Sequence, residues 1–140
     1  DAANPCGFNI HNGKRKISIA TDLGHMDDKI FNNLQGSSFI LLESNYDPEI
    51  LKVSKYPFHL KQRIAGPHGH LSNATAGKTI SALMKKDLKE VMLGHLSKEN
   101  NFPELAYQTV AEELMQAGAD ISNIKLSVAN RNEPGKMIII

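Results

Sequence analysis

The 140-residue sequence has no tryptophan and one cysteine, Cys6. One cysteine cannot form a disulfide within the chain, which favours a reducing compartment and leads us to expect a cytoplasmic protein. No apolar run approaches the roughly 20 residues that a membrane helix requires, so no membrane association is expected. The formal charge is only +1. This balance creates no strong overall attraction to nucleic acid, although a local basic patch could still bind one.

The sequence also lacks two common signatures of metal sites, since it has no His-x-x-x-His and no Cys-x-x-Cys pair. A complete metal site therefore cannot be identified from ligand spacing alone. The chain begins with Asp1 and not with methionine, in the segment DAANPCGF. We expect from this that residues were removed from the N-terminus or that the chain is a piece of a larger protein.

The length is that of one domain, and 41% of the residues are apolar, which suffices for a packed core. Segments at about 6–11 and 15–21 alternate apolar and polar residues on either side of Asn12-Gly13, which predicts a β-hairpin. Apolar runs over 37–43 and 88–94 predict buried strands. Two closing strands are expected at 124–129 and 136–140.

Helical patterns separate these strands. We expect a short helix over 26–34 and two short helices between 47 and 66, split at Tyr56-Pro57. Further helices are expected from Ser72 or Asn73 to about Met84, and from Asn101 or Pro103 to about Ala117 before Gly118. Helices that alternate with buried strands predict a layered α/β domain.

Four polar residues stand where these elements begin or end. Asp22, Glu43 and His95 follow or close predicted strands, and His70 lies just before a helix. His70 and His95 occur in similar segments, GHLSN and GHLSK, but the sequences after them share no pattern, so they are two loops and not a repeat. In α/β sheets, ligands bind where loops converge at the ends of strands. The four residues therefore predict a divalent-metal and acid–base site.

Structural interpretations compete with this prediction. Asp22 could cap the turn before Gly24, and Glu43 could pair with Lys52 or Lys61. A single histidine after a buried strand is more often a hydrogen-bonded structural residue than a ligand.

Other residues carry less weight. His25 lies close to Asp22 and is a spare ligand candidate, and His68 shares the loop of His70 and could assist it. Lys61 and Arg63 form a small basic face, which is typical of solvated surface but could contact phosphate.

Six segments give a more specific signal. DAANPCGF, TDLG, ESNYD, YPFHLKQRI, GHLSN and GHLSKENN occur in an order that resembles the WalJ/YycJ-like branch of the metallo-β-lactamase superfamily. The resemblance runs from residue 1 to about residue 128 and implies an αββα sandwich of two similar halves. Residues 1–140 resemble the C-terminal half as a single domain. The His-x-His-x-Asp-His motif of the other half, which supplies most metal ligands, is absent here, as is the histidine that precedes DAANP.

The resemblance also implies roles for individual residues. Asp22 matches the aspartate that bridges two metal ions, and His95 matches the last histidine ligand. Glu43 and His70 resemble a pair outside the metal shell of related transfer-RNA-processing nucleases, in which the histidine protonates the leaving oxygen. The implied cofactor is two divalent metal ions, zinc or manganese, both of which accept these ligands. Because few ligands are matched, we expect the chain alone to bind metal poorly and to be inactive.

The implied activity is hydrolysis of phosphodiesters, with DNA as the substrate and cleavage from the 5′ end. A small-molecule phosphodiesterase on the same fold is one alternative, and a non-catalytic interaction module is another. Half of a sandwich would expose the apolar sheet face that the other half covers. The expected protein partner is therefore the missing N-terminal half or a second copy of the chain.

Overall fold

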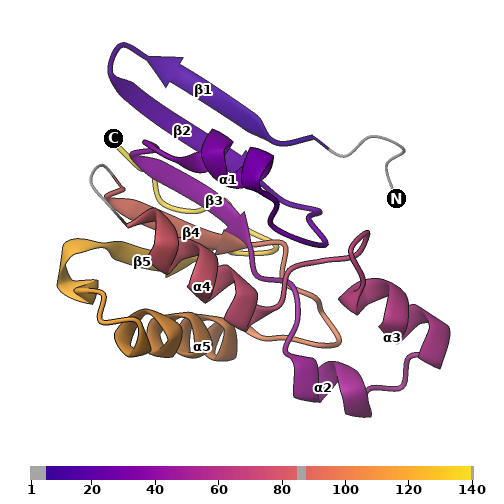
Figure 1. Cartoon of the computed structure of the whole chain (residues 1–140). Helices are drawn as coiled ribbons and strands as arrows, with labels where there is room; N and C mark the ends of the chain where they lie inside the picture. The colour runs from indigo at the N-terminus through magenta and orange to yellow at the C-terminus, as the bar shows by residue number, and fades with distance from the viewer. Residues whose placement is uncertain (1–5, 85–87, 140) are drawn as a thin grey trace.

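The computed structural model describes residues 6–84 and 88–139. Within them, five strands form one sheet whose spatial order follows the chain (Figure 1): β1 (Phe8–Asn12), β2 (Arg15–Ala20), β3 (Phe39–Glu43), β4 (Glu90–Gly94) and β5 (Lys125–Val128). β1 and β2 pair antiparallel as a hairpin, and β2 to β5 pair in parallel. The carboxyl ends of four neighbouring strands therefore lie at the same end of the sheet, where loops can build a site.

The helices begin and end at recognisable signals. They are α1 (Asp28–Leu34), α2 (Pro48–Val53), α3 (Phe58–Ala65), α4 (Asn73–Leu83), α5 (Pro103–Gln116) and the 3₁₀ turn η1 (Ile121–Asn123). Asp27 caps α1, and the Ser72 hydroxyl accepts from the Thr75 amide to cap α4, as Ser and Asp do at N-caps. Gly118, with a φ of 71°, follows the end of α5.

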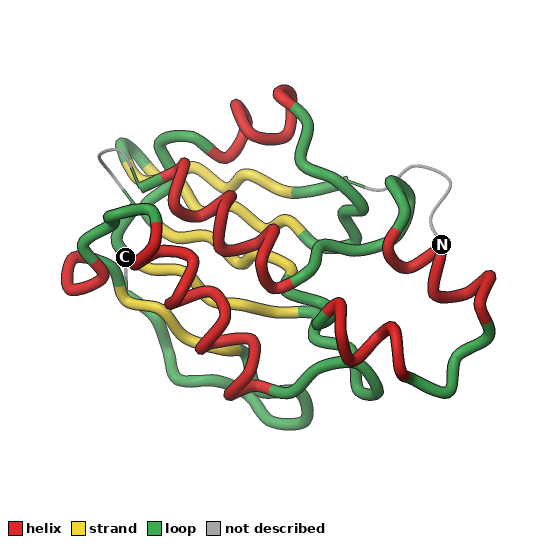
Figure 2. Tube along the Cα trace, turned by 60° about the horizontal axis from the view of Figure 1, so that its bottom comes forward, coloured by secondary structure: helices red, strands yellow, loops and turns green. Residues whose placement is uncertain are grey.

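One face of the sheet carries the hydrophobic core. α1, α4 and α5 all lie on this face (Figures 1 and 2). Every second strand residue points into it, and the cluster includes Ala20, Ile40, Leu42, Val91 and Leu93. α4 and α5 approach closely at Gly77, where a side chain would meet Glu113. α2 and α3 lie away from this layer, beyond the carboxyl end of β3 (Figure 1).

The opposite face of the sheet is also apolar. Its residues are in register across β1 to β4 and lie outside the core cluster: Phe8, Ile10, Ile17, Ile19, Phe39, Leu41 and Met92. Among the described residues no helix covers this face, and Phe8 and Ile10 are 59% and 53% exposed. The sheet is therefore apolar on both sides, which is typical of the middle layers of a larger α/β protein.

The predicted layered α/β fold is confirmed, with two local differences. The hairpin loop consists of Gly13 and Lys14, because Asn12 pairs with Arg15 and Gly13 adopts the positive φ of 59°. The strand predicted at 136–140 is wrong for residues 136–139, which have no regular structure, and residue 140 lies outside the described residues. An apolar run predicts a strand only where a neighbouring strand offers free backbone groups.

Candidate active site

The carboxyl end of the sheet brings the four predicted residues together. Asp22 comes two residues after β2, Glu43 is the last residue of β3, and His95 directly follows β4. Because these three strands are neighbours in parallel register, their ends lie side by side. His70 comes from the loop between α3 and α4 and lies beside them, with its ring centre 5.1 Å from that of His95.

A short parallel pairing places the His70 loop. The segment after β3 runs beside the start of α4, where the backbone N–H of Asn45 donates to the Leu71 carbonyl at 2.9 Å. The backbone N–H of Asn73 donates in turn to the Tyr46 carbonyl at 3.0 Å. Gly69 makes the tight packing of this loop on α3 possible, because a Cβ there would lie 2.1 Å from the Ile64 carbonyl oxygen. These backbone contacts fix His70 next to the end of β3.

Glu43 is fully buried and holds both histidines. Its Oε1 lies 2.7 Å from His70 Nδ1 and 2.6 Å from His95 Nδ1. Its Oε2 accepts from the Leu23 amide at 2.8 Å and lies 3.5 Å from the Leu71 amide. One carboxylate thus orients two imidazoles and also ties the loop after β2 to the site.

The protonation of this cluster follows from its hydrogen bonds. Burial acts to raise the pKa of Glu43, but hydrogen bonds from His70, His95 and the Leu23 amide outweigh burial and lower that pKa below its ordinary value. An ionised carboxylate only accepts hydrogen bonds, so both Nδ1 atoms carry a proton and donate it. The same hydrogen bond to Glu43 raises the pKa of His95 above its ordinary value, although burial of the ring opposes that rise. In the neutral imidazoles Nε2 is then left as a lone-pair donor for a metal ion.

Asp22 faces these free nitrogens. Its Oδ1 lies 3.8 Å from His95 Nε2. Asp22, His70 and His95 each offer a ligand atom, and these three atoms all lie within 4.8 Å of one another. A carboxylate and two imidazoles at this spacing suit a divalent transition metal.

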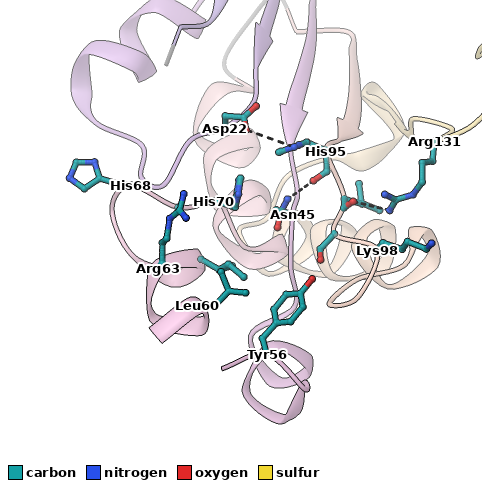
Figure 3. A pocket seen from close by; sticks show the side chains of 14 residues that line it. Asp22, Asn45, Tyr56, Leu60, Arg63, His68, His70, His95, Lys98 and Arg131 are labelled. Carbon is teal, nitrogen blue, oxygen red and sulfur yellow. Dashed lines mark hydrogen bonds and ion pairs between the residues drawn. The ribbon is translucent and has the colours of Figure 1, made fainter. Parts of the chain in front are cut away.

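The backbone at two of these residues is unusual. Asp22 and His95 have φ values of 61° and 55° and are the non-glycine residues with positive φ among those described. This conformation costs about 1–3 kcal/mol per residue and recurs at functional sites. Both side chains are thereby turned toward the shared cavity at the carboxyl end of the sheet (Figure 3).

The other sequence candidates have different surroundings. Glu43 does not pair with either lysine, since Lys52 lies near Glu49 and Lys61 donates to the Lys52 carbonyl. His25 Nδ1 lies 3.0 Å from the Pro67 carbonyl oxygen, so it joins two loops outside the ligand group.

His68 and Arg63 line the same cavity as His70 (Figure 3). His68 is exposed and is not part of the three-residue ligand group.

A buried amide network behind the site is not evident from the sequence. Asn101 donates to the backbone carbonyls of Ser44 and Asn45 at 2.9 and 3.1 Å and lies 2.8 Å from Asn73 Oδ1. Asn45 donates to the His95 carbonyl at 2.6 Å. These bonds join the loops that carry Glu43, His70 and His95. The only sequence signal is an unusual density of asparagine after the predicted strands.

In its fold and site the protein is an α/β protein with a candidate metal centre at the carboxyl ends of its parallel strands. No protein-family model matches the chain. Exodeoxyribonuclease YycJ of Bacillus anthracis is 35% identical over 118 residues, covering 84% of this chain and 45% of that protein. Exodeoxyribonuclease WalJ of Streptococcus pneumoniae is 36% identical over 117 residues, covering 84% and 44%.

The chain is therefore similar to the WalJ/YycJ exodeoxyribonucleases over 84% of its length, and the resemblance predicted from its sequence is confirmed. It spans less than half the length of these relatives. This share, together with a single helix-covered sheet, is consistent with half of a metallo-β-lactamase fold. None of the described helices has the length and apolarity to cross a membrane.

Proposed function

We propose that this chain is the C-terminal half of a metal-dependent phosphodiester hydrolase that acts on DNA. The observation that supports it most strongly is the group of Asp22, His70 and His95, held by Glu43 at the end of the sheet. Two relatives of the chain carry the name exodeoxyribonuclease, which favours DNA as the substrate class. From the family resemblance we further propose cleavage from the 5′ end.

The donor set fits a divalent metal ion. Asp22 and His95 serve as ligands in this proposal, through a carboxylate oxygen and Nε2, and either zinc or manganese accepts such ligands. Two ions are proposed, with the remaining ligands in the part of the family that this chain does not match. Metal ions in such a pair activate water and stabilise negative charge on the phosphate.

His70 is the proposed general acid. Hydrolysis forms a bond from a water oxygen to phosphorus, and this water gives up one proton to the solvent. The bond from phosphorus to the leaving oxygen breaks, and that oxygen must gain a proton. A second proton on His70, at Nε2, can be given to that oxygen, while Nδ1 stays hydrogen-bonded to the buried Glu43 carboxylate. Glu43 is a positioning residue, because its two oxygens are occupied by His70, His95 and the Leu23 amide.

Cleavage of end-labelled DNA by the complete protein tests this proposal. With Mn²⁺ or Zn²⁺ present, a single-stranded oligonucleotide labelled at its 5′ end should release the label first as a mononucleotide. Chelation should abolish cleavage, and His95→Ala should slow it by at least about 100-fold, since metal activation contributes several kcal/mol to the barrier. Cleavage that persists in chelator, or that is unchanged in His95→Ala, would contradict the proposal.

A further inference from the structure

The cavity beside His70 and His95 is larger than the proposed metal group needs. Its volume is about 490 Å³, within the range of small-molecule sites. Several lining residues have no role in the hydrolysis proposed above. Three of them are cations, Arg63, Lys98 and Arg131, and three others form an apolar and aromatic wall: Tyr56, Leu60 and Ile64.

Lys98 and Arg131 lie on one side of His95 (Figure 3). Lys98 is exposed and comes three residues after His95 in the same loop. Arg131 follows β5, so a fourth parallel strand also contributes a side chain at this end of the sheet. Arg131 Nη2 donates to the Leu96 carbonyl at 2.8 Å, which holds the guanidinium beside the His95 loop.

The apolar and aromatic wall comes from α3 and from Tyr56, which lies two residues before that helix. Leu60 and Ile64 are four residues apart and therefore lie on the same face of the helix. Tyr56 is half-buried, precedes Pro57 at the start of α3, and directs its hydroxyl into the cavity (Figure 3). An aromatic ring and two aliphatic side chains give a surface on which a flat nucleobase can pack.

We propose that this cavity is a subsite for one unpaired nucleotide next to the scissile phosphate. Lys98 and Arg131 contact the phosphate of that nucleotide, and the wall of Tyr56, Leu60 and Ile64 receives its base. The assignment deepens the proposed function and rests on it. Lysine and arginine are the usual phosphate contacts in protein–DNA complexes, and aromatic residues stack on bases that have left the helix.

Two properties follow from the chemistry of the lining. The base contact is tolerant of sequence, because every base has a face to stack and the Tyr56 hydroxyl is the one polar group of this three-residue wall. The base can reach Tyr56 only when it is not stacked in a duplex, so a single-stranded end enters the subsite and a blunt end does not.

Binding of DNA in chelator tests the subsite without any contribution from catalysis. The complete protein is titrated into a fluorescein-labelled oligothymidine, and anisotropy gives the Kd at several salt concentrations. Lys98→Ala and Arg131→Ala should each weaken binding by about tenfold, since each removes a charged hydrogen bond. Each should also lower the slope of log Kd against log salt by about 0.7, the value for one contact on a single strand.

Matched variants separate the contributions of the two phosphate-binding cations and of the apolar and aromatic wall from general effects on binding. Lys89→Ala removes an exposed lysine just before β4, at the opposite end of that strand from His95, and should change neither the Kd nor the slope. Tyr56→Ala should weaken binding by about fivefold or more with an unchanged slope, and Tyr56→Phe should restore it. Lys98→Ala is the decisive variant because its exposed side chain has no structural bond to lose, whereas Arg131→Ala also loses the bond to Leu96.

The outcomes distinguish the subsite from the function. If the wild type cleaves DNA with metal but Lys98→Ala and Arg131→Ala bind with an unchanged Kd and slope, the subsite is overturned and the function stands. If the wild type neither binds nor cleaves DNA, the function fails and the subsite with it. If blunt duplex binds as tightly as the single strand, with the same dependence on Tyr56, the assignment to an unpaired nucleotide is wrong.

Discussion

At the scale of single residues, Glu43 connects the two histidines through one oxygen. Glu43→Gln keeps the shape but replaces an ionised acceptor with a neutral amide. Hydrogen bonds to a charged group contribute about 1.5–3 kcal/mol each, so we expect the free energy of unfolding to fall by about 3 kcal/mol. Metal affinity should fall by about 10–100-fold, because the imidazoles lose their orienting partner. Urea denaturation and calorimetric titration with Mn²⁺ measure the two effects.

Glu49→Gln is the matched control for this change. Glu49 is exposed on α2, with its carboxylate 3.8 Å from Lys52, and exposed ion pairs of this kind contribute little. The control should leave metal affinity unchanged. Equal effects of the two substitutions would mean that Glu43 contributes only through its charge and not through its position between the histidines.

His70 has two possible roles within the same geometry, and a substitution separates them. His70→Ala removes the proposed acid but leaves Asp22 and His95 as ligands. We expect the complete protein to retain its bound metal, measured by elemental analysis, while cleavage slows by about 100-fold or more. The comparison variant Asp22→Asn keeps a residue that tolerates the φ of 61° and should lose metal as well as activity. Loss of metal from His70→Ala would instead make His70 a ligand.

The sequence indicates these four residues and, through the family resemblance, the pair of Glu43 and His70, but not the bond from Glu43 to His95. Asp22, Glu43 and His95 are predictable because strand ends are visible in the apolar pattern and parallel strands align their ends. The bond from Glu43 to His95 depends on the pairing of residues 43–46 with the loops around them, which local patterns do not encode. Asn101 escapes prediction for the same reason, since its partners lie 28 to 57 positions away.

At the scale of elements, the loop between α3 and α4 depends on Gly69. Gly69→Ala would place a Cβ 2.1 Å from the Ile64 carbonyl oxygen, a contact that the backbone must move to relieve. We expect the free energy of unfolding to fall by about 1–3 kcal/mol, as for other overpacked sites, and His70 to shift away from Glu43. Gly135→Ala is the control, since nothing lies within 4 Å of a Cβ there and its φ is not positive. Denaturation curves of both variants, with metal titration, measure the difference.

Elements with a local sequence signal are predictable. A strand that forms only where a distant partner strand is available is not. The hairpin, the Ser72 cap and the stop at Gly118 each depend on residues within a few positions of one another. The apolar run at 136–140 looks equally strand-like, yet residues 136–139 pair with no strand. β5 is already the last strand in the sheet order, and whether a further strand joins it depends on tertiary contacts.

At the scale of the whole molecule, helices cover one face of the sheet, and no described helix covers the other, here called the open face. The open face carries Phe8, Ile10 and five further apolar residues in register across four strands. Phe8 and Ile10 are exposed, and exposed apolar patches mark interaction surfaces in soluble proteins. The chain also spans less than half the length of its relatives. We therefore infer that this face packs against the remainder of the complete protein, as in a sandwich of two sheets between two layers of helices.

The 140-residue chain alone should then cover the open face with a second copy. We expect sedimentation velocity to show an association that strengthens with concentration. The double variant Phe8→Lys and Ile10→Lys should weaken it by about tenfold or more, since it places two charges on the edge of the apolar face. Val53→Lys changes another exposed apolar residue, 80% exposed on α2 and away from this face, and should have no effect. A chain that stays monomeric at high concentration would contradict this inference. Burial of apolar surface is the only force invoked, and the same face of a second copy would gain from it as well.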